Sequence, residues 1–135
     1  MVTIIIKTAN ESGDRMAVTP SGKVVGRMKR GYTWRGTQRH YAIAGLGGNL
    51  VEIGAVPTKQ KAAQVIGEFF DEQVRLLATV DQKIKEVSDA QELLHHAPTA
   101  FSLLDEGLNR LHLKRGQYQY FADLIKDEEE TSNEN

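Results

Sequence analysis

The chain contains no cysteine. That absence excludes a disulfide framework, thiolate metal sites, cysteine nucleophiles and thiol redox motifs, and it suits a reducing compartment. No run approaches the roughly 18 apolar residues that a membrane span requires. The amino-terminal MVTIIIKT is also too short for the apolar core of a signal peptide. We therefore expect a cytoplasmic protein that does not associate with a membrane.

Acidic residues are missing from a long stretch of the amino-terminal part. Thirty-seven consecutive residues separate Asp14 from Glu52, and they contain seven basic side chains and no acidic one. Residues 1–57 hold eight basic and three acidic residues, a net charge of +5, whereas residues 58–135 hold nine and fifteen, a net charge of -6. The total of -1 therefore hides two regions of opposite sign.

Residues 1–57 have the patterns of short β-strands separated by turns. The strand-like segments are 2–8, 15–19, 23–29, 39–44 and 49–54. Strict alternation places Arg27 and Lys29 on one face of their strand and Met28 on the other, so one face of the sheet is expected to be basic. The polar, glycine-marked segment 30–39 is expected to be an exposed, partly extended loop.

After Pro57 the hydrophobic period changes from two to 3.6. Thr58 is a suitable N-cap, and an amphipathic helix of about 28 residues is predicted from Lys59. Its length requires a helical hairpin or a dimer to cover the apolar side. We therefore take the apolar seam as a candidate dimer or partner interface. Its residues are Ile66, Phe70, Leu77, Val80, Ile84 and Val87.

Three further helical pieces are predicted beyond this helix. Ser88-Asp-Ala-Gln91 has the form of a capping box that restarts a short helix, Pro98 opens another that Gly116 ends, and residues 118–126 form a last piece. The predicted fold class is α+β: an amino-terminal antiparallel sheet of four or five short strands, a long amphipathic helix, and two or three further helices. We expect residues 1–57 and 58–126 to form one compact domain, followed by a disordered acidic tail at 127–135.

Basic and aromatic residues alternate within and beside the acid-free stretch. Such a mixture is typical of nucleic-acid surfaces, because cations neutralise phosphates and exposed aromatic rings stack on bases. The candidate nucleic-acid-binding residues are Arg27, Lys29, Arg30, Tyr32, Trp34, Arg35, Arg39, His40 and Tyr41. Two other interpretations remain open: a surface for an acidic protein partner, and a solvated face that docks against the chain's own acidic helices.

Residues 30–72 resemble the three-strand-plus-helix DNA-binding domains of phage-type integrases and plant AP2-type factors. In those domains a basic, aromatic sheet precedes a Gly-x-x-Thr-Lys-x-x-Ala helix start, for which this chain offers Gly54, Thr58, Lys59 and Ala62 with one extra residue after the glycine. The resembling segment is under a third of the chain, and no integrase catalytic region accompanies it. The resemblance implies that the sheet enters the major groove of DNA. The contacts that it implies are Arg30, Trp34, Arg35, Arg39 and Tyr41.

Patterns for cofactor, metal and catalytic sites are not met. Gly45-Leu-Gly-Gly48 lacks the Lys-Ser/Thr of a phosphate loop, and the adjacent His95 and His96 point about 100° apart on a helix. We therefore expect no cofactor, no metal site and no catalytic residue. A metal-dependent nuclease that uses Asp14 and Glu52 is the remaining enzymatic alternative.

Together these features predict a small, non-enzymatic nucleic-acid-binding accessory protein of the phage or mobile-element kind. It would contact DNA or RNA through the basic β surface, with a homodimer as one arrangement. The alternative is an interaction or inhibitor module that binds a host protein through its amphipathic helices and acidic end.

Overall fold

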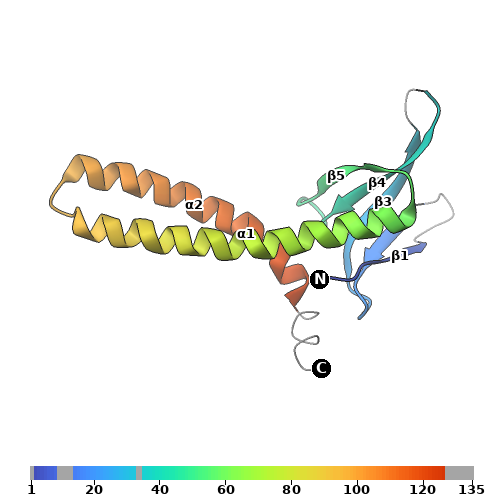
Figure 1. Ribbon diagram of the computed structural model, residues 1–135, viewed down its shortest axis with the longest axis horizontal. Coiled ribbons are helices and arrows are strands. Elements are labelled where there is room, and N and C mark those ends of the chain that lie inside the picture. Colours follow the sequence, from blue (N-terminus) through green and yellow to red (C-terminus); the bar gives the residue numbers. More distant parts are fainter. Residues whose placement is uncertain (1, 9–13, 33–34, 127–135) are drawn as a thin grey trace. The chain divides into compact units, whose positions relative to one another are not determined.

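The computed structural model describes residues 2–8, 14–32 and 35–126 (Figure 1). Within these residues, five strands form one antiparallel sheet in sequence order, and two helices follow. The α+β class and the number of strands are as predicted. The strands are β1 (Ile5–Thr8), β2 (Arg15–Val18), β3 (Val24–Tyr32), β4 (Gln38–Ala44) and β5 (Val51–Val56). The helices are α1 (Lys59–Leu93) and α2 (Pro98–Leu124). Trp34 and the predicted disordered tail lie outside the described residues.

The prediction of two or three further helices is matched only in part, because α2 alone follows α1 in the part that the structure describes. The capping box does not form, and α1 continues through Ser88 to Leu93. Gln91, which would close the box, instead donates from Nε2 to the Phe101 carbonyl oxygen and to Asp105 Oδ1, at 3.4 and 3.3 Å. Hydrogen bonds from Gln91 to α2 therefore form in place of the local capping box that was predicted to interrupt α1.

Gly116 does not end α2 either. A glycine inside an exposed stretch of helix costs about 1 kcal/mol relative to alanine, which is small beside the packing on both sides of it. On one side Arg115 pairs with Asp81 of α1, and on the other Phe121 is buried. Tertiary packing on both sides therefore outweighs the low helix propensity of Gly116.

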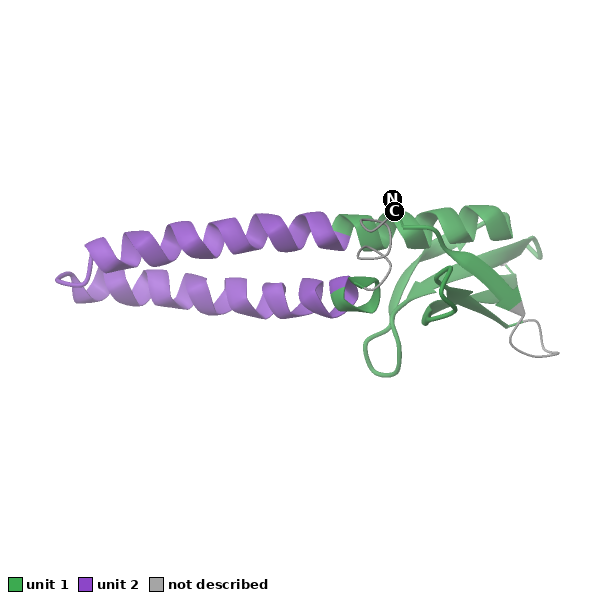
Figure 2. Ribbon diagram, turned by 90° about the horizontal axis from the view of Figure 1, so that it is seen from below, with its two compact units in different colours: residues 1–72, 123–135 green, residues 73–122 purple. Residues whose placement is uncertain are grey.

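The chain divides into two compact units (Figure 2). Unit 1 comprises residues 1–72 and 123–135, and unit 2 comprises residues 73–122. The division falls inside the helices and not at Pro57, because the first turns of α1 belong with the sheet. Each unit therefore has its own set of packed side chains.

In unit 1 the first turns of α1 lie over one face of the sheet (Figures 1 and 2). Thr58 caps the helix as predicted, since its Oγ1 accepts a hydrogen bond from the Lys61 backbone amide at 3.1 Å. Gly67 lets the amino-terminal segment cross the helix, because a Cβ atom there would lie 2.7 Å from the Val2 carbonyl oxygen. Asp71 fixes this crossing by accepting from the Val2 amide at 3.1 Å. The core residues include Ala17, Val25, Met28, Ala42, Ala62, Ile66, Phe70 and Ile125.

Unit 2 is an antiparallel hairpin of the later part of α1 and most of α2. Val80, Leu108 and Phe121 are buried in it. The predicted apolar seam of α1 therefore does not form one exposed interface: Ile66 and Phe70 are buried in unit 1, and Val80 is buried in the hairpin. The remaining seam residues, Leu77, Ile84 and Val87, are half-buried.

Candidate nucleic-acid interface

The antiparallel register distributes the side chains of β3 and β4 over two faces. Directly paired residues share a face, and successive residues alternate between faces. Met28 pairs with Ala42, and both are buried on the face that α1 covers. Lys29 pairs with Tyr41 on the opposite face, and Arg27 lies on that face too. We call the face opposite α1, which presents Arg27, Lys29, Arg39, Tyr41 and Ile43, the open face.

The β3–β4 hairpin extends beyond the rest of the sheet. Strand β2 pairs with β3 only as far as Met28, and β5 pairs with β4 only as far as His40. Beyond these points no other described strand pairs with β3 or β4, and Gly31 lies opposite Arg39. The two ends of segment 30–39 are therefore strands, although the segment was expected to be a loop. Pairing between the two strands provides hydrogen bonds for their backbone groups, and this needs no buried core. We call residues 29–32 and 38–39 the basic ribbon.

Four cations of this region have no partner among the residues that the structure describes. Arg27, Lys29 and Arg30 are exposed, and Arg39 is half-exposed. Among the described residues, none of these four side chains makes an ion pair or a side-chain hydrogen bond. Their positive charge therefore remains available to an external anion.

Tyr41 lies across the ribbon at Gly31. A Cβ atom at residue 31 would overlap the tyrosine ring, so the glycine is what allows the ring to rest on β3. Beside the ring is a shallow hollow of about 400 Å³, with the nearly buried Ile43 among its lining residues and Glu52 of β5 opposite Ile43. An aromatic ring is thus held among cations, with a single carboxylate among the residues that line the hollow.

His40 does not join this surface. It pairs with Arg30 on the face that α1 covers, it is buried, and its Nδ1 has no hydrogen-bond partner among the described residues. Burial lowers the pKa of His40, and the nearby cations Arg30, Arg15 and Lys59 lower it further. The imidazole is therefore neutral at pH 7 and carries no charge for a phosphate.

The structure brings together four of the nine predicted residues on the open face. By register Arg30 and Tyr32 belong to the other face of the ribbon, where Tyr32 is 65% exposed, but Arg30 also lines the hollow beside Tyr41. Arg35 is exposed in the turn, and Trp34 lies outside the described residues. The sequence did not assign Gly31 or Glu52 to this surface, because their proximity to Tyr41 and Ile43 depends on cross-strand register. The four residues on the open face are Arg27, Lys29, Arg39 and Tyr41.

The described residues hold neither a metal-binding cluster nor a membrane-spanning helix. No three histidine, aspartate or glutamate side chains there gather as the ligands of a metal ion would. No helix in the same ranges combines the length and apolar character needed to cross a membrane.

Comparison of the chain with family models, curated proteins and solved structures gave no match.

Proposed function

We propose that the chain is a small, non-enzymatic accessory protein that binds DNA or RNA through the open face and the basic ribbon. The observation that carries this proposal is a set of four cations near the ring of Tyr41, in an acid-poor region, that have no partner within the described residues. Each cation that approaches a phosphate releases condensed counterions, which favours binding. The ring of Tyr41, whose one side rests on Gly31, offers its other side to a base or a sugar.

The shape of the hairpin favours duplex DNA as one ligand. A two-stranded β ribbon fits the major groove of B-DNA, which is about 12 Å wide. Residues 30–72, which resemble the integrase-type and AP2-type domains, hold the end of β3, the strands β4 and β5 and the start of α1. Counting the whole of β3, three strands precede a helix here, as in those domains. This order supports the resemblance, and with it an accessory role in a phage or mobile element.

Glu52 marks one edge of the proposed contact surface. It pairs with Ile43 across β4 and β5, and its side chain is exposed. A carboxylate at this position repels phosphate, so the nucleic acid is expected to follow β3 and β4 and to stop short of β5. Removing this charge should strengthen binding, whereas removing a cation should weaken it.

The proposal is tested by fluorescence anisotropy with a labelled 20-base-pair duplex and with single-stranded DNA and RNA of the same length. The chain should bind at least one probe with a Kd in the micromolar range near 100 mM salt. Lys29→Gln combined with Arg39→Gln should weaken binding about tenfold or more, and Glu52→Gln should strengthen it.

A matched control is Lys83→Gln combined with Lys85→Gln, because it removes the same charge from exposed positions on the hairpin. Its affinity should stay near that of the unaltered chain. An equal loss of nucleic-acid affinity in the two double variants would show that net charge alone governs binding. Failure to bind any probe at low salt would overturn the proposal.

A further inference from the structure

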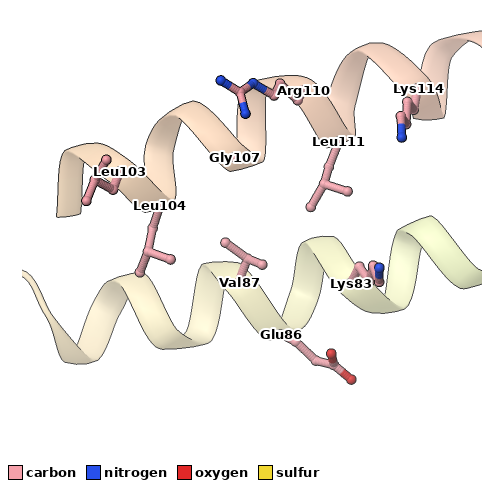
Figure 3. A pocket seen from close by; sticks show the side chains of 9 residues that line it. All are labelled: Lys83, Glu86, Val87, Leu103, Leu104, Gly107, Arg110, Leu111 and Lys114. Carbon is pink, nitrogen blue, oxygen red and sulfur yellow. The ribbon is translucent and has the colours of Figure 1, made fainter. Parts of the chain in front are cut away.

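An apolar groove runs along the helical hairpin of unit 2 (Figure 3). Its volume is about 480 Å³. Val87 of α1 and Leu104 and Leu111 of α2 point toward one another between the two helices and line it (Figure 3). The hairpin thus buries these side chains only in part, and they remain half-exposed.

Two residues of α2 leave apolar space or apolar surface uncovered at the groove. Gly107 has no side chain, and a Cβ atom there would meet no atom within 4 Å. Leu103, one turn earlier, is 65% exposed. A leucine left in water beside an unfilled groove loses the free energy that burial would provide, so both features favour an apolar occupant.

Three cations flank the groove. Lys83 of α1 and Arg110 and Lys114 of α2 line it, and within the described residues none of their side chains makes an ion pair or a hydrogen bond. Its single acid, Glu86, accepts a hydrogen bond from Gln82 at 3.2 Å. Three positive charges against one negative charge give the rim a net charge of +2.

We propose that this groove binds the apolar face of an amphipathic helix that is supplied by another protein and flanked by aspartate or glutamate. The lining of α2 runs from Leu103 to Lys114, about 16 Å of helix, which gives room for apolar anchors at positions i, i+4 and i+7 of the occupant. The acidic flanks would pair with the rim cations. This inference concerns unit 2 alone and does not depend on the proposed nucleic-acid binding.

Charge and composition argue against two other occupants. In a symmetric dimer the same patch meets itself, so a second copy would bring two rims of net charge +2 together. The chain's own acidic tail, DEEETSNEN at 127–135, contains no large apolar residue to fill the groove. A partner helix with an apolar stripe and acidic flanks would both fill the groove and pair with the rim cations.

The test uses the full chain and a synthetic, monomeric 18-residue helical peptide that carries leucines at i, i+4 and i+7 and glutamates beside them. A second peptide replaces each glutamate with lysine. By fluorescence anisotropy, the glutamate peptide should bind at least about tenfold more tightly than the lysine peptide. Lys83→Glu combined with Lys114→Glu should reverse this preference.

A groove-filling variant separates docking from folding. Gly107→Leu places a side chain in the groove, whereas Gly116→Leu places one at an exposed helical position with nothing within 4 Å. Leucine has the higher helix propensity, so both variants should keep or raise the melting temperature. Only Gly107→Leu should weaken the binding of the glutamate peptide, by about tenfold or more. Neither variant should change the affinity for nucleic acid.

Three results would overturn the proposal. The first is equal affinity for the two peptides, and the second is equal peptide affinity of the Gly107→Leu and Gly116→Leu chains. The third is a dimer in analytical ultracentrifugation that only Gly107→Leu converts to a monomer, because a second copy would then be the occupant. Loss of nucleic-acid binding in the anisotropy experiment on Lys29 and Arg39 leaves all three readouts unaffected.

Discussion

The unpartnered cations of the open face and the ribbon allow the salt dependence of binding to be worked out in advance. For duplex DNA the logarithm of the binding constant falls with the logarithm of salt concentration by about 0.9 for each phosphate that is neutralised. Contacts from Arg27, Lys29, Arg30 and Arg39 thus give a slope of about -3.6. Raising the salt from about 50 to 200 mM should then weaken binding roughly 150-fold.

Replacing Arg27 and Lys29 with glutamine is the decisive perturbation. Two of the four contacts are removed, so the slope should fall to about -1.8 and the same increase in salt should weaken binding only about 12-fold. Both side chains are exposed, so the fold should not change. The assay is anisotropy of a labelled 20-base-pair duplex over a sodium chloride series, with Lys83→Gln and Lys85→Gln as the charge-matched control. A slope in the Arg27 and Lys29 variant that equals that of the unaltered chain would refute the assignment.

Three further predictions concern single residues. Gly31→Ala should push the Tyr41 ring off the ribbon and weaken nucleic-acid binding in the anisotropy assay, with a loss of folding stability below about 1 kcal/mol. Gly116→Ala should stabilise the chain by about 1 kcal/mol in urea unfolding, whereas Gly67→Ala should not, because its Cβ meets the backbone of the amino-terminal segment. Since the pKa of His40 is lowered by folding, the unfolded chain binds more protons below about pH 6.5, so stability is complete above that pH and falls as the pH drops. The stability difference between pH 7.5 and 5.5 should shrink in His40→Gln, and an unchanged difference would exclude His40 as its source.

Local patterns in the sequence were sufficient to predict several features of the fold. The change of period after Pro57 and the cap at Thr58 located the start of α1, and alternation in β3 separated Lys29 from Met28. These features depend on neighbouring residues only, which is why composition and period reveal them.

Features that depend on distant residues could not be predicted. The stop signals at Gly116 and at the Ser88 capping box are overridden by contacts across the hairpin, such as that between Arg115 and Asp81. The contact between Tyr41 and Gly31 follows from the cross-strand register, which no local pattern of residues fixes uniquely. The sequence therefore identified the cations of the surface but not their arrangement.

The most direct measurement is a titration of the ¹⁵N-labelled chain with a 12-base-pair duplex, followed by NMR. If the open face and the basic ribbon bind nucleic acid, the amide signals of Lys29, Gly31 and Tyr41 should shift most, and those of Leu104 and Gly107 in the hairpin should stay in place. Shifts that concentrate in residues 73–122 while Lys29 and Tyr41 remain unchanged at saturation would contradict the assignment of this surface.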